Sequence, residues 1–563
     1  MKMKLLGAAI GALVVAAIPA RAAISGTVRN ADTLAPVAGA EVRLQIDPTG
    51  PFVLSAADGS FTLPVSPAGT VEVTAVVPYN RLAAINYTIA GAQANDGDTG
   101  VTLDLIPLGL DDPAYEPPRA ADSCLACHQG HYDEWSTSNH SGAAVDFWVL
   151  DLFSGTGSPG GANGFNYRDT HDPGETGFCA TCHTPMADVF DPGNTMLDEV
   201  TSVGGLDGVS CLACHQIDHV NESVNSIHLL GNATYRFPGG FLTERYVWGP
   251  LKDVSYPGMR SSYNPIFTDS RFCASCHQYS APFGQTTYTE WQASSFAVPG
   301  PGFRSCQDCH MPARIDPDVI CDEPFQPVRP AGQRHAHTFV GASPELLTSA
   351  VELDTTAELD GDTVRVQANL TNLVGHSFPT GVSIRNALLV ITAAIDGTPL
   401  TQTAGPTVPG WANDDVPGTQ PGDFGGFPGT GFAKILEGRI NGQGPPVSPV
   451  LFIDAETVLE NSNLPAGQSR LTAVEFALPP GTPTGAQIDV EARLLYRRAF
   501  RALAVTKQWT QTPQGGPIEI EVEADRLTLV NGSVLDILTA SESGLILLGL
   551  GLAASALLVL RRR

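Results

Sequence analysis

The pattern of apolar and polar positions divides this chain of 563 residues into two outer stretches that alternate and a middle stretch that does not. Alternation in the first outer stretch, 23–109, predicts strands at Ser25–Val28, Glu41–Gln45, Ser60–Val65 and Thr70–Val77. Alternation in the second, 345–529, predicts strands at Asp362–Leu370, Ala387–Ala393, Gln487–Leu495 and Ile518–Glu523. We therefore expect a β-sandwich in each outer stretch, the second immunoglobulin-like in style.

Turn and loop signals complete this prediction. Asp58-Gly59 predicts a hairpin turn in the first stretch, and a loop rich in proline and glycine is expected around Ala404–Gly444. Pro117-Pro118 is typical of a linker and precedes the middle stretch, 118–342. Glycine (58) and proline (44) are abundant and only 16% of residues are charged, so short helices and much irregular structure are expected in the middle.

Both ends of the chain carry apolar runs. Lys2 and Lys4 precede Leu5–Ile18 and then Ala20-Arg21-Ala22, which predicts a signal peptide over 1–22. After a linker at 530–543, an uncharged run ends in three arginines, which predicts a transmembrane helix or a sorting tail over 544–563. The predicted fold class is multidomain: an N-terminal β-sandwich, a central segment with short helices, a C-terminal β-sandwich and a single C-terminal transmembrane helix.

Five copies of Cys-x-x-Cys-His occupy the middle stretch and contain ten of the eleven cysteines. The cysteine pairs are Cys124 and Cys127, Cys179 and Cys182, Cys211 and Cys214, Cys273 and Cys276, and Cys306 and Cys309. The histidines that complete them are His128, His183, His215, His277 and His310. This is the attachment signature of haem c, in which the thiols bond to the porphyrin and the histidine ligates iron. The sequence therefore predicts five covalently bound haems.

Zinc and thioredoxin-like sites fit this motif less well. A zinc site pairs its Cys-x-x-Cys units without requiring a histidine after each one, and a thioredoxin-like motif would occur once, near a βαβ pattern. Cys321 is left over and is expected to be a buried free thiol. The formal charge of −27 argues against nucleic acid as a partner and is compatible with a basic redox protein.

Histidines are concentrated where iron ligands are needed. Twelve of the thirteen lie in the middle stretch, and His376 alone lies outside it. Five are used as proximal ligands, so eight remain for the five distal positions of full bis-histidine ligation, although methionine is an alternative ligand. A bis-histidine iron has no open position, which favours electron transfer over catalysis.

The middle stretch also contains an internal duplication. The second and third motifs start 32 residues apart and the fourth and fifth start 33 apart. Glu134-Trp135-x-x-Ser138 is echoed by Glu290-Trp291-x-x-Ser294, but Phe296 stands where the first copy has His140. We infer a duplicated pair of haem motifs, in which one haem has lost its expected distal ligand or takes it from elsewhere.

These motifs resemble the multihaem family that includes the tetrahaem electron carrier of ammonia oxidisers. The resemblance rests on Cys124–His128 with Trp135-x-x-Ser138-x-His140, Gly208–His215 with His219, Cys306–Pro312, and Arg334-His-Ala-His-Thr-Phe339. Many relatives carry a sandwich with Gly-His-x-x-Pro-Thr-Gly, which is Gly375–Gly381 here. In the first outer stretch, Gly26-Thr-Val, Pro36–Leu44 and Asp58-Gly-Ser-Phe61 resemble the carboxypeptidase regulatory-like β-sandwich, a spacer or adhesion module.

The resemblance implies distal iron ligands among the remaining histidines. His140 and His219 come first, and His335 or His337 next. His376 is either a ligand that attaches the sandwich to the haem segment or a loop histidine bonded to the backbone. His171 and His228 are less favoured, and His131 lies so close to its own motif that a solvated or supporting role is expected.

Three functions are consistent with these features of the sequence. The first is an exported pentahaem cytochrome, periplasmic or at the cell surface and anchored by its C-terminal helix, which carries electrons between redox partner proteins in extracytoplasmic respiration rather than acting as a catalyst. The second is an oxidoreductase that acts on a small nitrogen or sulfur compound at a five-coordinate haem. The third is a subunit of a surface cytochrome filament.

Overall fold

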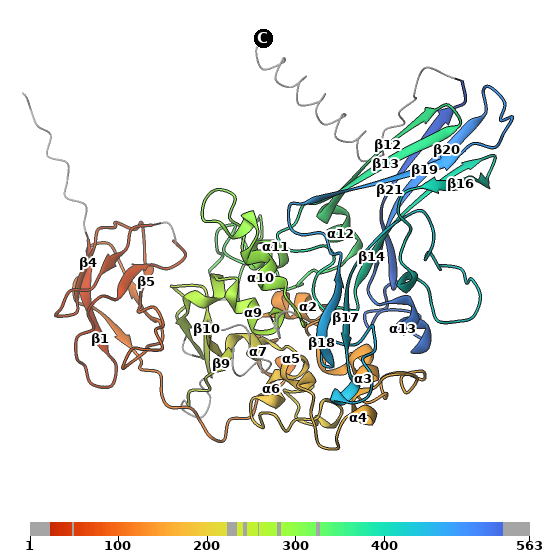
Figure 1. Cartoon of the computed structure of the whole chain (residues 1–563). Coiled ribbons are helices and arrows are strands. Elements are labelled where there is room, and N and C mark those ends of the chain that lie inside the picture. Colours follow the sequence, from red (N-terminus) through yellow and green to blue (C-terminus); the bar gives the residue numbers. More distant parts are fainter. Residues whose placement is uncertain are drawn as a thin grey trace, which may run out of the picture. The chain divides into compact units, whose positions relative to one another are not determined.

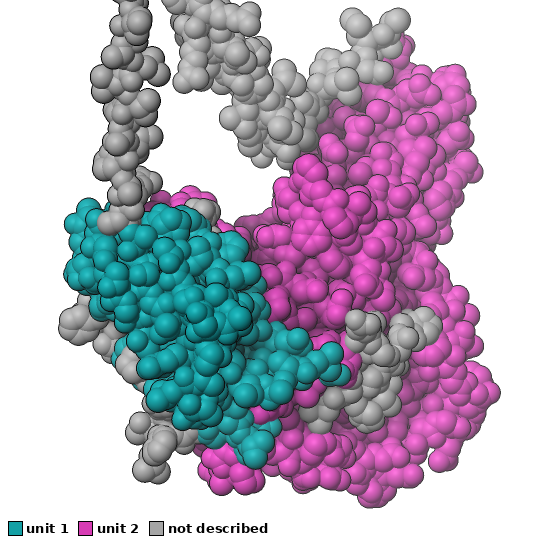
Figure 2. Space-filling model, turned by 90° about the vertical axis from the view of Figure 1, so that its left-hand side faces the viewer, with its two compact units in different colours: residues 1–111, 238–264 teal, residues 112–237, 265–563 magenta. Residues whose placement is uncertain are grey.

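The computed structural model describes residues 23–47, 50–221, 233–239, 245–256, 258–278, 283–322 and 327–532. Two compact units are present: the first combines Met1–Asp111 with Pro238–Asn264, and the second combines Asp112–Phe237 with Pro265–Arg563 (Figure 2). The first unit therefore includes a segment that lies between the third and fourth cysteine motifs of the sequence.

The first unit is built from strands in three small sheets. Its strands are β1 (Ile24–Asn30), β2 (Glu41–Leu44), β3 (Val53–Leu54), β4 (Ser60–Leu63), β5 (Val71–Val76), β6 (Ala90–Ala94), β7 (Val101–Leu105), β10 (Arg245–Gly249) and β11 (Met259–Tyr263). The sheet orders are β4-β1-β7, β3-β2-β5-β6 and β10-β11. Apolar residues of the first two sheets share one core. Alternation correctly predicted four of their strands, β1, β2, β4 and β5.

The turn at Asp58-Gly59 is present, but its flanking strands belong to different sheets. Gly59 adopts a φ of 77°, a left-handed conformation that favours glycine. β3 pairs with β2, whereas β4 pairs with β1, so the turn passes the chain from one sheet to the other. The predicted hairpin was wrong for this reason: both strands are short, and each finds its partner elsewhere.

Residues 238–264 are joined to the first unit by hydrogen bonds and packing. Tyr79 N donates to Tyr263 O (2.9 Å), and Ile46 N donates to the carboxylate of Asp253 (2.7 Å). Trp248, only 1% exposed, meets the ring of Tyr79 edge-on at 5.8 Å. This segment therefore completes the N-terminal unit.

Short helices and two short strands make up the first part of the second unit (Figure 1). The helices are α1 (Ala120–Ser123), α2 (Gln129–Ser136), η1 (Ala143–Val145), α3 (Phe147–Phe153), α4 (Tyr167–Thr170), α5 (Cys179–His183), α6 (Pro185–Asp188), η2 (Leu197–Glu199), α7 (Cys211–His215), η3 (Pro265–Thr268), α9 (Arg271–His277), α10 (Thr287–Gln292), η4 (Ser295–Ala297) and α11 (Cys306–His310). The strands β8 (Ile217–Val220) and β9 (Ala233–Tyr235) pair with each other. This agrees with the prediction of short helices and irregular structure.

The second part of this unit is a two-sheet structure. Its elements are α12 (Pro344–Ala350), β12 (Val351–Asp360), β13 (Thr363–Asn372), β14 (Asn386–Ile395), β15 (Thr398–Pro399), β16 (Thr401–Ala404), η5 (Gly410–Ala412), β17 (Gly429–Gly438), η6 (Ile440–Gly442), β18 (Ala455–Asn461), β19 (Ser469–Ala477), β20 (Gln487–Arg497), α13 (Arg501–Thr506) and β21 (Glu519–Val530). The sheet orders are β12-β13-β19-β16 and β18-β17-β14-β20-β21, with β15 on β14. One core contains side chains of both sheets, so the four predicted strands are confirmed.

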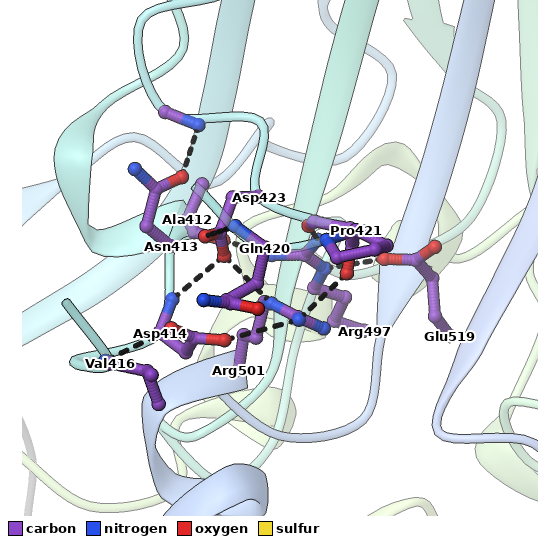
Figure 3. Close-up of polar contacts among 12 residues, drawn as sticks. Ala412, Asn413, Asp414, Val416, Gln420, Pro421, Asp423, Arg497, Arg501 and Glu519 are labelled. Atoms are coloured by element: carbon purple, nitrogen blue, oxygen red, sulfur yellow. Dashed lines mark hydrogen bonds and ion pairs between the residues drawn. The ribbon is translucent and has the colours of Figure 1, made fainter. Parts of the chain in front are cut away.

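The expected loop around Ala404–Gly444 is only partly a loop, because it contains β17. The irregular part is ordered by two arginines (Figure 3). Arg501 pairs with Asp423 (2.8 Å) and Asp414 (3.1 Å). The side chain of Arg497 is 3% exposed and pairs with Glu519 at 2.7 Å while donating to backbone carbonyls of the loop. Buried charge pairs thus hold a segment that has little regular structure.

A buried polar cluster connects the helical part of the second unit to its sheets. Asp151 is fully buried and accepts hydrogen bonds from Trp509 Nε1 (2.7 Å) and from Ser158. Lys507 is also fully buried and donates to the carbonyls of Asp151 (2.9 Å) and Gly161 (2.6 Å). Trp148 stacks on Trp509 at 4.4 Å. Each buried polar group therefore has a partner on the other side of the contact.

No helix among the described residues is long and apolar enough to cross a membrane. The longest of them, α2, has 8 residues, whereas a span needs about 20. This corrects the predicted fold class, which included a C-terminal transmembrane helix: the described architecture is multidomain, with many strands and short helices. The predicted signal peptide (1–22) and C-terminal helix (544–563) lie outside the described residues.

Candidate functional site

The cysteine motifs lie on or beside single helical turns. α5, α7 and α11 each consist of one motif, α9 ends with its motif, and the first motif lies between α1 and α2. Because positions i, i+3 and i+4 share one face of a helix, one turn directs both cysteines and the histidine to the same side. In four of the five copies the helix thus contains the motif.

Two of these turns begin with a serine cap. Ser210 Oγ accepts a hydrogen bond from Ala213 N (3.3 Å). Ser305 Oγ accepts one from Asp308 N (3.2 Å), and the Asp308 carboxylate accepts one from Ser305 N (2.7 Å). Helices of five residues are unstable alone, so these caps explain how the sequence starts a turn at the third and fifth motifs.

Three motif histidines donate their Nδ1 proton to backbone carbonyls. The acceptors are Ile320 O for His128 (2.7 Å), Ala143 O for His183 (3.1 Å) and Val340 O for His310 (2.6 Å). A carbonyl oxygen only accepts, so the proton resides on Nδ1 and the lone pair of Nε2 is available. This is the usual second interaction of a histidine that binds a metal.

Three of the predicted distal ligands have the same arrangement. His335 Nδ1 donates to Met311 O (2.7 Å), His337 Nδ1 to His335 O (3.0 Å) and His376 Nδ1 to Ser377 O (3.0 Å). For His376, the sequence left open a backbone-bonded loop histidine or an iron ligand. The backbone bond is present, and because it uses Nδ1 it leaves Nε2 free for a metal.

Two motif histidines face a histidine from another part of the second unit. The ring centroids of His310 and His376 are 6.4 Å apart with an interplanar angle of 15°. Those of His277 and His140 are also 6.4 Å apart, at an angle of 56°. Metal–nitrogen bonds of about 2 Å place two rings that bind one metal from opposite sides roughly 6 Å apart. Both pairs therefore have the spacing of trans axial ligands.

His140 and His277 are neutral at pH 7. Burial lowers the pKa of His140 to about 3, with neighbouring histidines adding to the effect, and lowers the pKa of His277 to about 4. The buried Nδ1 of His140 has no hydrogen-bond partner among the described residues. Neutral imidazole is the form that ligates metals, so both rings are suited to coordination.

His131 and His337 lie close to the first and third motifs. The His131 ring is 5.8 Å from that of His128 and 4.8 Å from that of His337. Burial lowers the pKa of His337 to about 4, and the electrostatic effect of nearby His215 acts in the same direction. The sequence favoured a solvated or supporting role for His131, and the structure places it against His337, a candidate ligand. His219 lies in β8, opposite Thr234 of β9, and His228 lies outside the described residues.

Cysteines of different motifs contact each other. The side-chain pairs are Cys124 with Cys211, Cys182 with Cys276, and Cys273 with Cys306. Burial raises the pKa of Cys179 to about 12 and that of Cys214 to about 12, so both positions are in apolar surroundings. Cys321 is half-buried. Its two chain neighbours both contact the first motif: Ile320 O accepts a hydrogen bond from His128, and Asp322 N donates one to Cys127 O (2.7 Å). The five motifs therefore gather in one compact region.

His171, a less favoured candidate, has both ring nitrogens occupied. Nδ1 lies 3.2 Å from Tyr167 O, and Nε2 lies 2.9 Å from the carboxylate of Asp454. Both side chains are nearly fully buried, and Tyr167 stacks on the imidazole at 3.8 Å. His171 thus joins α4 to the loop before β18 and has no nitrogen free for iron.

Sequence reasoning assigned no role to the two glutamates of the duplicated segment. Glu134 Oε2 accepts a hydrogen bond from the backbone N of His337 (2.7 Å). Glu290 Oε2 accepts one from the backbone N of Ser377 (3.1 Å), next to His376. The repetition of Glu-Trp at equivalent places in the duplicated segment could have indicated that the two glutamates have the same structural role.

Residues 123–216, which contain the first three motifs, match the family described as Cytochrome c554 and c-prime. This local match supports the interpretation of the Cys-x-x-Cys-His motifs as those of a multihaem c-type cytochrome. The match covers only part of the chain and neither of its sheet-containing regions, and a comparison with curated proteins finds no match.

A comparison with solved structures finds two similar chains. The first is a penta-heme cytochrome c552 from Thermochromatium tepidum, with 20% sequence identity, a TM-score of 0.48, and coverage of 73% of this chain and 98% of that chain. The second is the Fcho1 Mu homology domain from Danio rerio with bound Eps15 peptide, with 9% identity, a TM-score of 0.11, and coverage of 34% and 45%.

Proposed function

We propose that this cytochrome is an exported pentahaem protein that passes electrons along a chain of mainly bis-histidine haems in extracytoplasmic respiration. The ten motif cysteines would hold five haems through thioether bonds, and the five motif histidines would be their proximal ligands. The observation that carries this proposal is the pair of parallel imidazoles, His310 and His376, at the spacing of trans ligands.

The residues fit the cofactor in three respects. Each motif turn places its two thiols on one face with the histidine, as attachment to one porphyrin requires. Bonds from Nδ1 to carbonyl oxygens leave Nε2 available in three proximal and three distal candidates. Two ring pairs have a spacing that accommodates an iron between them.

The distal ligands would come from several segments. We assign His376 to the haem of Cys306 and Cys309, and His140 to the haem of Cys273 and Cys276. His219, His335 and His337 are the remaining candidates for the other haems.

Haem iron, once bound, supplies a one-electron couple whose potential depends on its axial ligands and its burial. At the two haems with facing histidine pairs, His310 with His376 and His277 with His140 would both ligate the iron and would leave no site there for an exchangeable substrate. Contacts between cysteines of different motifs support close spacing of neighbouring haems. Both features favour a carrier over a catalyst.

The proposed setting follows from the sequence. Attachment of haem c takes place outside the cytoplasm in bacteria, and the predicted signal peptide at 1–22 supports export to the periplasm or cell surface. The partners would be redox proteins. The net charge of −27 would attract a donor or acceptor with a basic surface, and such attraction weakens as salt is added.

A second candidate function is an oxidoreductase at one open haem. His183 bonds to Ala143 O, and the nearby Asp146 opposes the lowering of its pKa by burial. The observation that favours this function is Phe296, which stands in the second Glu-Trp segment where the first has His140, so one haem would lack its expected distal ligand. A small nitrogen or sulfur compound would bind at that open position.

Electron paramagnetic resonance of the purified holoprotein tests the proposal. Low-spin signals from all haems, unchanged by nitric oxide or hydroxylamine, are expected for a pure electron carrier. A high-spin signal from about one haem in five that shifts with either compound would favour the enzyme instead. Absence of any low-spin bis-histidine signal would contradict the proposal.

A further inference from the structure

The duplicated Glu-Trp segments make the same two contacts in both copies. The first is made by the tryptophan. Trp135 Nε1 in α2 donates to Val209 O (2.9 Å), and Trp291 Nε1 in α10 donates to Arg304 O (2.8 Å). Each acceptor lies two residues before the first cysteine of a motif, directly before the serine that caps the motif helix. The tryptophan therefore holds the start of a haem-attachment turn.

The second contact is made by the glutamate that precedes the tryptophan. Glu134 accepts from the backbone N of His337, while Glu290 accepts from the backbone N of Ser377 and from Thr380 Oγ1 (2.6 Å). In both copies a carboxylate thus binds the backbone of a loop that carries a distal-ligand candidate. Hydrogen bonds from N–H groups to a carboxylate are stronger than those to neutral acceptors, so they fix the loop firmly.

In the second copy the two contacts meet at one histidine pair. Trp291 holds the helix of His310, and Glu290 holds the loop of His376. These are the rings that face each other at 6.4 Å. One Glu-Trp pair therefore fixes both rings relative to each other.

We propose that Glu134 and Glu290 are positioning residues for the distal axial histidines, and that each Glu-Trp pair fixes the two axial ligands of one haem. This rests on the proposed bis-histidine function. In the second copy the haem is that of Cys306 and Cys309. In the first copy the same relationship assigns His337 to the haem of Cys211 and Cys214, because Trp135 holds that motif.

The surroundings keep both carboxylates in place. Glu134 also pairs with Arg314 and with Arg334, at 3.2 Å from the latter. Glu290 accepts a further bond from Thr286 Oγ1 (2.6 Å), and that hydroxyl accepts one from the buried Lys434 Nζ (3.1 Å). A cation near each carboxylate offsets the cost of partly burying its charge.

The position two residues after the shared serine differs between the copies, with His140 in the first and Phe296 in the second. His140 in the first copy faces His277, whereas Phe296 in the second copy lies beside Gly375, next to His376. A Cβ atom at Gly375 would lie 3.3 Å from Phe296 and 3.3 Å from Trp291. The second copy thus uses this position to support the distal loop, and Gly375 leaves room for that close approach.

The test compares Glu290→Ala with Glu290→Gln in the full-length holoprotein. Glu290→Ala removes the acceptor for Ser377 N and Thr380 Oγ1, so His376 would be held loosely. We expect about one haem in five to become high-spin, to bind carbon monoxide when reduced, and to return to low spin with added imidazole. His376→Ala should give the same spectra. Glu290→Gln keeps an acceptor oxygen and should retain the wild-type spectrum.

Two further variants make the result decisive. Glu460→Ala removes an exposed carboxylate on β18 and should change nothing. Glu290→Asp shortens the reach by one methylene and should give a partial high-spin fraction even if Glu290→Ala folds poorly. If Glu290→Ala and Glu290→Asp both keep every haem low-spin, or if Glu460→Ala matches them, the positioning role is overturned. Wild-type protein without low-spin bis-histidine haem would instead contradict the proposed function.

Discussion

The imidazole rings of His310 and His376 lie 6.4 Å apart at an interplanar angle of 15°. The first belongs to a haem motif on α11 and the second to the loop that follows β13 of the C-terminal sheets. Because Nδ1 of each ring is bonded to a carbonyl oxygen, the opposite nitrogen of each is available for a metal. In the proposed function, the C-terminal sheets would therefore supply an iron ligand, His376, to the haem of Cys306 and Cys309.

Replacement of His140 tests the second ring pair. His140→Ala removes the ring that faces His277, so the haem of Cys273 and Cys276 should lose one axial ligand. We expect a high-spin signal from about one haem in five, measured by electron paramagnetic resonance, and its reversal by imidazole.

His171→Ala is the matched control for this experiment, because both nitrogens of His171 are already bonded. It should leave every haem low-spin and lower the free energy of unfolding by about 1–3 kcal/mol, since Asp454 loses a buried partner. A high-spin haem in His171→Ala would contradict its structural role. Absence of a high-spin haem in His140→Ala would contradict its role as a ligand.

The buried cluster around Asp151 should contribute to stability without affecting the haems. Trp509→Phe keeps most of the ring but removes the N–H that donates to Asp151 Oδ2. Loss of a partner by a buried carboxylate should lower the free energy of unfolding by about 1–3 kcal/mol, measured by denaturant titration. Trp411→Phe is the control, because the indole nitrogen of Trp411 is buried without a partner among the described residues. Equal destabilisation by both variants would show that ring packing, and not the hydrogen bond, matters.

Glu523 makes the stability of the C-terminal sheets depend on pH. Burial raises the pKa of Glu523 from 4.5 to about 7, although a hydrogen bond from Leu353 N to its carboxylate acts in the opposite direction. The folded protein then binds a proton that the unfolded chain releases, so stability falls as pH rises from about 4.5 to 7. Glu523→Gln removes this dependence. Because Glu523 is only half-buried, we expect a gain of about 1 kcal/mol at pH 8 and little change at pH 4.

Thermal unfolding of Glu523→Gln and of Glu460→Gln across this pH range provides the measurement. The exposed Glu460 on β18 should show no such pH-dependent gain. A gain for Glu523→Gln that is larger at pH 4 than at pH 8 would contradict the raised pKa.

Local patterns in the sequence predicted the strands and the attachment motifs. Strands such as β13 and β20 bury one face in the sheet core, so their alternation is clear along the chain. The motif turns follow from a spacing of three and four residues, which is local as well. The predicted C-terminal transmembrane helix is the part of the fold class that had to be corrected.

Contacts between distant residues could not be predicted in this way. The sequence named both His376 and His310 but could not say that they face each other, because the chain between them includes the first strands of the C-terminal sheets. The membership of residues 238–264 in the N-terminal unit is also set by tertiary packing, through Trp248 and Asp253. The repeated Glu-Trp pair was visible, but the sequence could not show which backbone groups the two glutamates bind, because those groups lie 203 and 87 residues away.

The central claim is that five haems are covalently attached to this polypeptide, and intact mass spectrometry of the fully unfolded holoprotein tests it most directly. We expect the mass of the mature chain plus five haems, and the loss of one haem when both cysteines of a motif are replaced by serine, as in Cys306→Ser with Cys309→Ser. A denatured chain that carries no haem mass, or whose haem number does not change in that double variant, would contradict the account.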